Sequence, residues 1–142
     1  MQTQTQAQKT GELLGEIRGK TVSRTIKDIT PLGVGLELND EGKFVGGMYV
    51  ANHIETVNVF QNLDGTMQWE SKSLQMTTEG DTVVISGRGT GKATGPATVR
   101  AEGDVVFMTQ SKKLASLNGM AGRVEVNANN QTGEIEIKVY SK

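Results

Sequence analysis

Apolar and polar residues alternate with a period of two along much of the chain, most regularly in its second half. The alternation runs through residues 97–107, 120–128 and 134–140. Successive side chains of a β-strand point to opposite faces of a sheet, so this pattern predicts strands with one buried face. It favours an all-β protein.

Turn-forming residues divide the rest of the chain into similar short runs. Eighteen glycines and two prolines separate about eight to ten expected strands, the first beginning at Glu12. The segment 39–42, Asn-Asp-Glu-Gly, is typical of a hairpin turn, because Asn and Asp tolerate turn conformations and Gly adopts positive φ. The glycines of 87–91 lack the spacing of a phosphate-binding loop and are expected to let strands coil or cross closely.

One expected strand changes its phase. Apolar residues occupy odd positions at Met67 and Trp69 but even positions at Leu74 and Met76. One extra residue near 71–73 would produce this shift, which predicts a β-bulge. The alternative is an edge strand with both faces half exposed.

These elements predict a single closed antiparallel β-barrel of about eight strands with one short helical plug, because closure removes exposed strand edges. The plug is expected at 111–118, where Ser111 can cap a turn and Leu114 and Leu117 fall on one face. Residues 1–10 are expected to be a disordered polar tail, and residues 11–142 the barrel domain.

Charge and composition exclude several functions. Fifteen basic and sixteen acidic residues give a net charge of −1 without a basic cluster, so nucleic acid is not an expected partner. The absence of cysteine excludes disulfides and thiolate metal sites. No run approaches the roughly 20 apolar residues of a membrane helix. We therefore expect a cytoplasmic protein without membrane partner, metal or cofactor.

The single histidine is the first candidate for chemistry. His53 shares a strand face with Tyr49 and Glu55 if no bulge intervenes. In the functional interpretation, His53 acts as an acid–base group at the mouth of the barrel and Glu55 orients it. In the alternative, His53 is an ordinary surface or hydrogen-bonded residue.

Met67 and Trp69 share another strand face. They can line an apolar cavity or simply fill the core. If a ligand binds, the expected ligand-binding residues are Tyr49, His53, Met67 and Trp69. No catalytic residue is assigned.

Several segments resemble an uncharacterised family of small prokaryotic β-barrels. The segments are 15–22, 87–91, 107–118, 123–127 and 138–140. The resemblance extends over about residues 11–142 and implies a shape remotely like the barrels of allene oxide cyclases and dirigent proteins. Those barrels bind apolar molecules and often oligomerise, but none of their catalytic positions matches this chain.

Three functions remain open from the sequence. The first is a barrel that binds an apolar or amphipathic small molecule, with room left by small inward residues such as Ala97 and Ala101. The second is a packed structural barrel that forms a homo-oligomer, which is the expected assembly. The third is a cyclase-like or isomerase-like enzyme assisted by Tyr49, His53 or Glu70; an enzyme is the less favoured reading.

Overall fold

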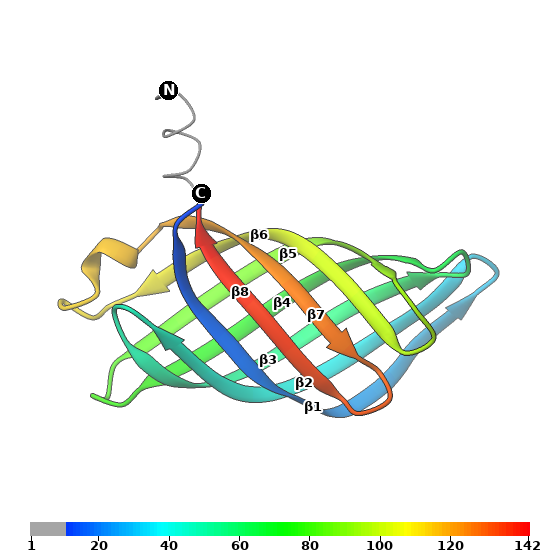
Figure 1. Ribbon diagram of the computed structural model, residues 1–142, viewed down its shortest axis with the longest axis horizontal. Helices are drawn as coiled ribbons and strands as arrows, with labels where there is room; N and C mark the ends of the chain where they lie inside the picture. The colour runs from blue at the N-terminus through cyan, green and yellow to red at the C-terminus, as the bar shows by residue number, and fades with distance from the viewer. Residues whose placement is uncertain (1–10) are drawn as a thin grey trace.

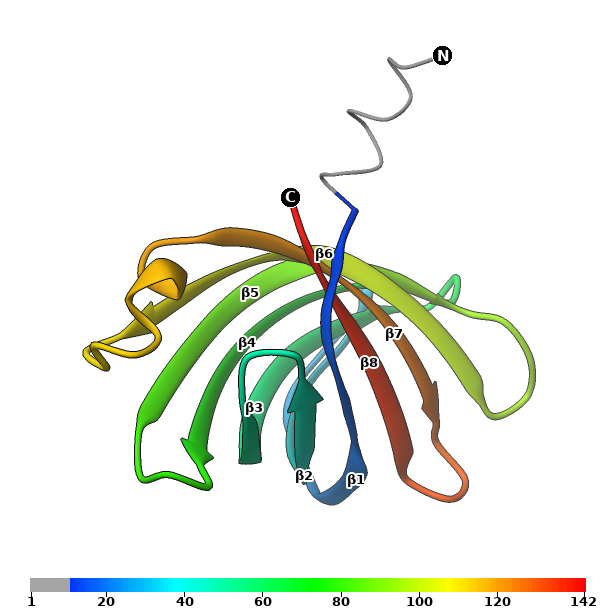
Figure 2. The same cartoon turned by 60° about the vertical axis from the view of Figure 1, so that its left-hand side comes forward.

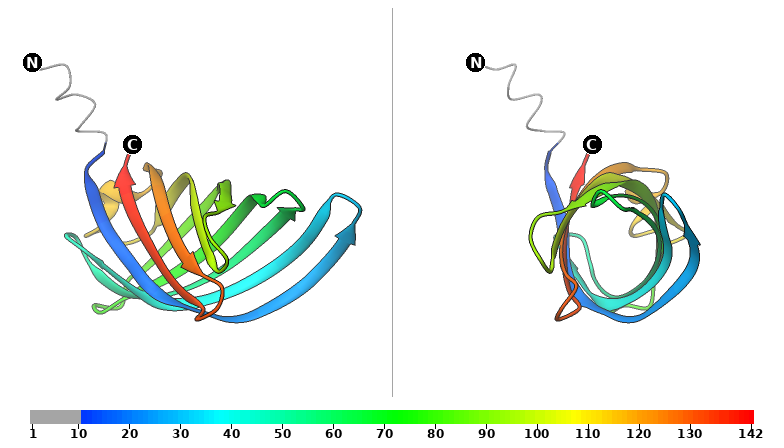
Figure 3. Two further views of the ribbon diagram at one scale, coloured as in Figure 1. Left: turned by 45° about the vertical axis from the view of Figure 1, so that its right-hand side comes forward. Right: turned by 90° about the vertical axis from the view of Figure 1, so that its right-hand side faces the viewer.

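Eight strands follow one another around a closed antiparallel barrel in the computed structural model, which describes residues 11–142 (Figure 1). The strands are β1 (Leu13–Thr30), β2 (Gly33–Gly46), β3 (Val50–Asn62), β4 (Thr66–Thr77), β5 (Thr82–Ala93), β6 (Thr98–Thr109), β7 (Ala121–Asn129) and β8 (Glu134–Ser141). β8 pairs with β1 and closes the ring, which the right-hand view of Figure 3 shows end on. The predicted barrel is confirmed, whereas the predicted tail at residues 1–10 lies outside the described residues.

The first two strands are longer than the sequence suggested. The segment 39–42, expected to be a hairpin turn, lies inside β2, so that prediction is wrong. Its glycine serves a close approach of strands, because a Cβ on Gly42 would lie 2.4 Å from the carbonyl oxygen of Arg18 in β1. β1 and β2 are joined at Thr30–Gly33, where the sequence also predicts a corner, and Asp40 belongs to the inner face of β2.

β4 contains no bulge. Its pairing with β3 and with β5 is continuous along the whole strand, so the predicted bulge near 71–73 is wrong. The odd positions point inward throughout, and the interior changes from apolar at Trp69 to polar at Ser71, Ser73 and Gln75. The bulges lie in β1, between Thr21 and Ser23 and between Ile26 and Asp28.

β1 extends beyond β8, which is one of the two strands that pair with it. Its pairing with β8 ends at Lys20 opposite Glu134, while its pairing with β2 continues to Thr30. The β1–β2 hairpin therefore extends past the other strands, as the left-hand view of Figure 3 shows. Beyond Thr21, no strand of the described chain pairs with the second edge of β1.

Glycines on β5 and β6 make room for the only tryptophan. A Cβ on Gly103 would lie 2.6 Å from Cζ2 of Trp69, and Gly89 pairs with both residues across the sheet. The indole therefore lies against bare backbone, and its Nε1 donates a hydrogen bond of 3.1 Å to the carbonyl oxygen of Thr90. The glycine-rich segment is thus part of the barrel wall, as expected.

A short 3₁₀ helix, η1 (Ala115–Leu117), lies in the connection between β6 and β7 at one end of the barrel (Figure 2). Leu114 and Leu117 belong to the hydrophobic core and are 5% and 2% exposed. The backbone N–H of Leu114 donates to Oγ of Ser111. The predicted helical plug is confirmed in these features.

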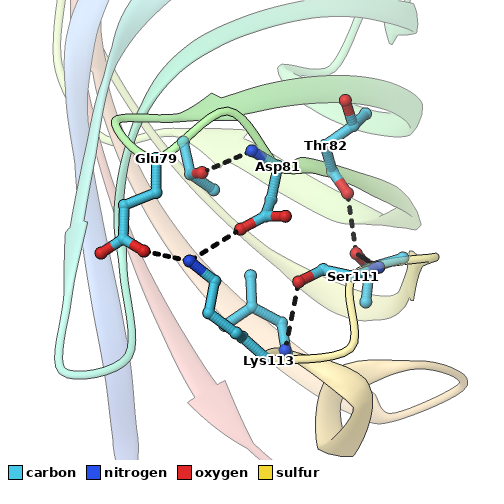
Figure 4. A network of polar contacts seen from close by, with 8 residues as sticks. Glu79, Asp81, Thr82, Ser111 and Lys113 are labelled. Carbon is cyan, nitrogen blue, oxygen red and sulfur yellow. Dashed lines mark hydrogen bonds and ion pairs between the residues drawn. The ribbon is translucent and has the colours of Figure 1, made fainter.

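Polar contacts attach the plug to the neighbouring β4–β5 turn (Figure 4). The ammonium group of Lys113 contacts the carboxylate of Glu79 and lies 3.6 Å from Oδ2 of Asp81. Nearby, Oγ1 of Thr109 donates to the carbonyl oxygen of Thr82 over 2.7 Å. Exposed ion pairs contribute little to stability, so the buried leucines hold the plug and the ion pairs orient it.

Candidate ligand-binding cavity

A cavity of about 240 Å³ occupies the barrel interior. It reaches the end of the barrel opposite η1, where Gln61, Met67 and Asn129 lie beside the β3–β4 and β7–β8 turns. Most of its wall is aliphatic: Ile17, Leu36, Leu38, Val57, Val59, Ile85, Val99, Ala101, Val105, Val124, Val126, Ala128, Ile135, Ile137 and Val139. An apolar guest can therefore contact most of this surface.

A polar cluster lies in the wall of this cavity, on the inward faces of β2 and β3. Asp40 and Glu55 are direct partners across the two strands, and His53 lies two residues from Glu55 on the same face. Asp40 is 6% exposed and His53 is 1% exposed. Oγ1 of Thr21, on β1, donates a hydrogen bond of 2.7 Å to Oδ1 of Asp40.

His53 belongs to a chain of hydrogen bonds that leads away from the cavity. The Tyr49 hydroxyl donates to Oε1 of Gln75. Nε2 of Gln75 lies 3.0 Å from Nδ1 of His53, and Nε2 of His53 lies 2.7 Å from Oε1 of Glu55. Because the Gln75 amide nitrogen can only donate, Nδ1 accepts and the imidazole carries its proton on Nε2, where it donates to Glu55.

Burial dominates the electrostatics of the cluster. Desolvation raises the pKa of Asp40 to about 6, and the charge of Glu55 adds to this effect, while the Thr21 hydrogen bond and His53 oppose it. Desolvation also raises the pKa of Tyr49 above its ordinary value of 10. Asp40 is therefore a carboxyl group that gains or loses its proton just below neutral pH.

Two serine hydroxyls on β4 face the same space. Ser71 and Ser73 line the cavity and are each 7% exposed. Neither side chain forms a hydrogen bond within residues 11–142. Every fully enclosed polar side-chain atom there has a partner, so the two hydroxyl oxygens are not fully enclosed. Their hydroxyls therefore keep their surface toward the cavity, where a ligand can reach them.

The structure brings three of the four expected site residues to the cavity. His53, Met67 and Trp69 line it. Tyr49 lies behind it: its ring stacks on Phe44, with 4.6 Å between centroids and 25° between planes. Tyr49 reaches the site only through Gln75. Whether these residues bind a ligand stays a prediction.

The carboxylate of the enzymatic alternative lies elsewhere. Glu70 is exposed on the outer face of β4, opposite in direction to the inward Trp69. It therefore cannot act on a molecule in the cavity. Within the described chain, no group of three or more histidine or acidic side chains is arranged to hold a metal ion.

Sequence reasoning missed four polar residues of the interior: Asp40, Ser71, Ser73 and Gln75. A signal existed for each of them. Asp40 shares the even phase of Leu36 and Leu38, and the other three continue the odd phase of Trp69. A strand pattern extended through its polar positions would have found them.

Comparisons with known proteins establish the fold alone. No family model and no curated protein matches the chain. A protein of unknown function from Clostridium acetobutylicum superimposes with a TM-score of 0.80 at 12% identity, over 91% of this chain and 93% of that one. A β-barrel-like protein from Acinetobacter baumannii has a TM-score of 0.78 at 13% identity, over 92% and 93%. A conserved protein of unknown function from Rhodopseudomonas palustris has a TM-score of 0.77 at 12% identity, over 90% and 93%.

These neighbours are uncharacterised small β-barrel proteins, as the sequence resemblance led us to expect. The remoter resemblance to allene oxide cyclases and dirigent proteins is not shown by them. In the part of the chain that the structure describes, no helix is long and apolar enough to cross a bilayer.

Proposed function

We propose that the barrel binds a small amphipathic molecule, with its apolar part against the aliphatic wall and its polar end at the cluster of Asp40, His53 and Glu55. The observation that carries this proposal is that one cavity combines a mostly aliphatic wall with a cluster of three polar side chains, Asp40, His53 and Glu55. A few converging polar groups in an apolar pocket are typical of small-molecule sites.

The volume of the cavity limits the size of the guest. At 240 Å³ it is smaller than the roughly 300–1,000 Å³ of pockets that hold drug-sized ligands. The proposed ligand is therefore a molecule such as a six-carbon chain with one polar head, and not a long fatty acid.

Trp69 supplies the readout for a binding experiment, because it lines the cavity and is the only tryptophan of the chain. We expect short aliphatic amines, alcohols or acids, added to the full-length protein, to shift or quench its fluorescence with saturation. Isothermal titration calorimetry measures the same affinities independently. Flat titrations by both methods across this panel would contradict the proposal.

A matched pair of variants tests where the molecule binds. Ala101→Phe adds a ring to the cavity wall on β6, whereas Val106→Phe adds the same ring to the outer face of that strand. We expect Ala101→Phe to abolish binding and Val106→Phe to preserve it. Equal binding by both variants would place the ligand outside the barrel.

A second proposal concerns assembly, and it is supported by the outer surface. Apolar side chains form one row across four strands, from Ile54 on β3 through Leu74 and Val84 to Met108 on β6. Ile54 and Met108 are 47% and 49% exposed. Leu74 and Val84 between them are half-buried. An apolar row on the outer face favours contact with another protein surface, and a second copy of the chain is the simplest occupant.

Light scattering tests this homo-oligomer. We expect a mass above that of one chain, which Leu74→Lys reduces to the monomer by placing a charge in the row. Gln68→Lys, on the outer face of the same strand but outside the row, serves as the control. A monomeric mass for the unmodified protein across a wide concentration range would contradict the proposal.

A further inference from the structure

We infer that the polar end of the ligand is a cation, an ammonium group held by Asp40, Glu55 and the serine hydroxyls of β4. This inference rests on the proposed function, because it assigns a ligand class to the same cavity. Two features of the cluster support it: its hydrogen-bond acceptors lie close together, and no lysine or arginine of the described chain pairs with its carboxylates.

The acceptors lie together on three adjacent strands. Asp40 pairs with Glu55 across β2 and β3, and Glu55 pairs with Ser73 across β3 and β4. Ser71 lies on the same inner face, two residues closer to the open end. Side chains that are direct cross-strand partners have Cβ atoms about 4.5–5.5 Å apart. One small head group can therefore reach several of these side chains at once.

Each carboxylate retains an oxygen for a ligand. Thr21 donates to Oδ1 of Asp40, and His53 donates to Oε1 of Glu55. Within residues 11–142, Oδ2 of Asp40 and Oε2 of Glu55 have no hydrogen-bond partner, and neither do the hydroxyls of Ser71 and Ser73. An ammonium group carries three donors and no acceptor, which matches this set of free acceptors.

No lysine or arginine of the described chain pairs with the carboxylates of Asp40 and Glu55. Among the cavity-lining residues of the described chain, only Arg24 has a guanidinium or ammonium group. Arg24 is held at the rim, where its Nη2 donates to the carbonyl oxygen of Asn130 over 2.8 Å. His53 contacts Glu55 through Nε2 and forms no hydrogen bond with Asp40. Buried carboxylates are normally paired with a cation, so a ligand cation would supply the missing partner.

The same contacts disfavour the other common head groups. A ligand carboxylate would meet two like charges in a desolvated site. A hydroxyl can enter, but it donates one hydrogen bond and brings no charge. The expected order of affinity is therefore amine, then alcohol, then carboxylate.

Three six-carbon probes with the same chain test this order. n-Hexylamine, 1-hexanol and hexanoate are titrated into the full-length protein at pH 7.5, above the pKa of Asp40, with Trp69 fluorescence and calorimetry as readouts. We expect hexylamine to bind at least about tenfold more tightly than hexanol, and hexanoate to bind most weakly. Equal affinities or the reverse order would overturn the inference and leave the proposed function standing. No binding by any probe would overturn both.

Isosteric variants show whether the carboxylates cause the preference. Asp40→Asn and Glu55→Gln should each weaken hexylamine binding by at least about tenfold while leaving hexanol binding nearly unchanged. Glu41→Gln is the matched control, because it removes a neighbouring carboxylate on the exposed face of β2. Trp69 emission and circular dichroism confirm that each variant is folded. Full hexylamine affinity in both Asp40→Asn and Glu55→Gln would overturn the inference.

Discussion

The two sides of the cavity wall are built from different residues. β2, β3 and β4 contribute Asp40, His53, Glu55, Ser71 and Ser73, whereas the lining positions of β5 to β8 carry no titratable side chain in the described chain. Polar groups on adjacent strands are close enough to hydrogen-bond with one another, whereas groups across the lumen are not. We call β2–β4 the chemical wall, because it carries these polar side chains, and β5–β8 the shape-determining wall, because its side chains only limit the volume of the cavity.

The shape-determining wall should tolerate added volume least. Gly103→Ala would place its Cβ 2.3 Å from the carbonyl oxygen of Arg88 and 2.6 Å from Trp69. We expect a loss of about 3 kcal/mol or more in the free energy of unfolding, because the backbone at Arg88 would have to move away from the new methyl group. Urea denaturation measures it.

Gly47→Ala is the control, because nothing lies within 4 Å of its Cβ position. Its effect should stay within about 0.5 kcal/mol. Equal stability of the two variants would mean that the glycine wall is not tightly packed.

On the chemical wall, removing the buried charge of Asp40 should raise the free energy of unfolding of the protein. The folded pKa of Asp40, about 6, lies above its ordinary value of 3.8, so the folded state binds the proton more tightly than the unfolded state. The wild type therefore loses stability as pH rises from about 4 to about 6, by at most about 3 kcal/mol at ~1.4 kcal/mol per pH unit.

Asp40→Asn lacks this loss. Its stability relative to the wild type should rise between pH 4 and pH 6 and stay constant above. Thermal unfolding across pH 4–8 checks this. A difference that does not change with pH would show that Asp40 is not desolvated in the folded protein.

The hydrogen-bond chain behind the cavity provides a smaller test of the same wall. Gln75→Leu leaves the Tyr49 hydroxyl and Nδ1 of His53 without their partner, which should cost about 1–3 kcal/mol. Gln68→Leu, at an exposed position of the same strand, should change stability by less than about 0.5 kcal/mol. If the two substitutions have equal effects in urea denaturation, the chain does not stabilise the fold.

The smallest effect is expected at the serines. Ser73→Ala removes a hydroxyl that has no hydrogen-bond partner within residues 11–142, so stability should change by less than about 0.5 kcal/mol. Its hexylamine affinity should fall about threefold, because one weak acceptor is lost. A large loss of stability would reveal a structural role for Ser73 and would argue that its hydroxyl is not kept for a ligand.

The sequence predicted one wall better than the other. The alternation on β6, β7 and β8 is regular because their inward residues are apolar, and the number and class of strands followed from it. On β2 and β4 the inward residues include Asp40, Ser71 and Gln75, which break the apolar pattern and were read as a turn and a bulge. Polar residues of a barrel interior look like exposed residues in a sequence, unless the phase of the strand is extended through them.

The stretch of β1 beyond Thr21, which has no strand on its second edge within the described chain, affects how the protein behaves at high concentration. An unpaired strand edge is a template on which other chains can add as further strands, the first step toward fibres. Here the two bulges of β1 interrupt the row of backbone donors and acceptors, and the charged side chains of Arg24 and Lys27 lie along the same stretch. Within residues 11–142, the irregularity of this strand therefore makes its open edge a poorer template for added strands.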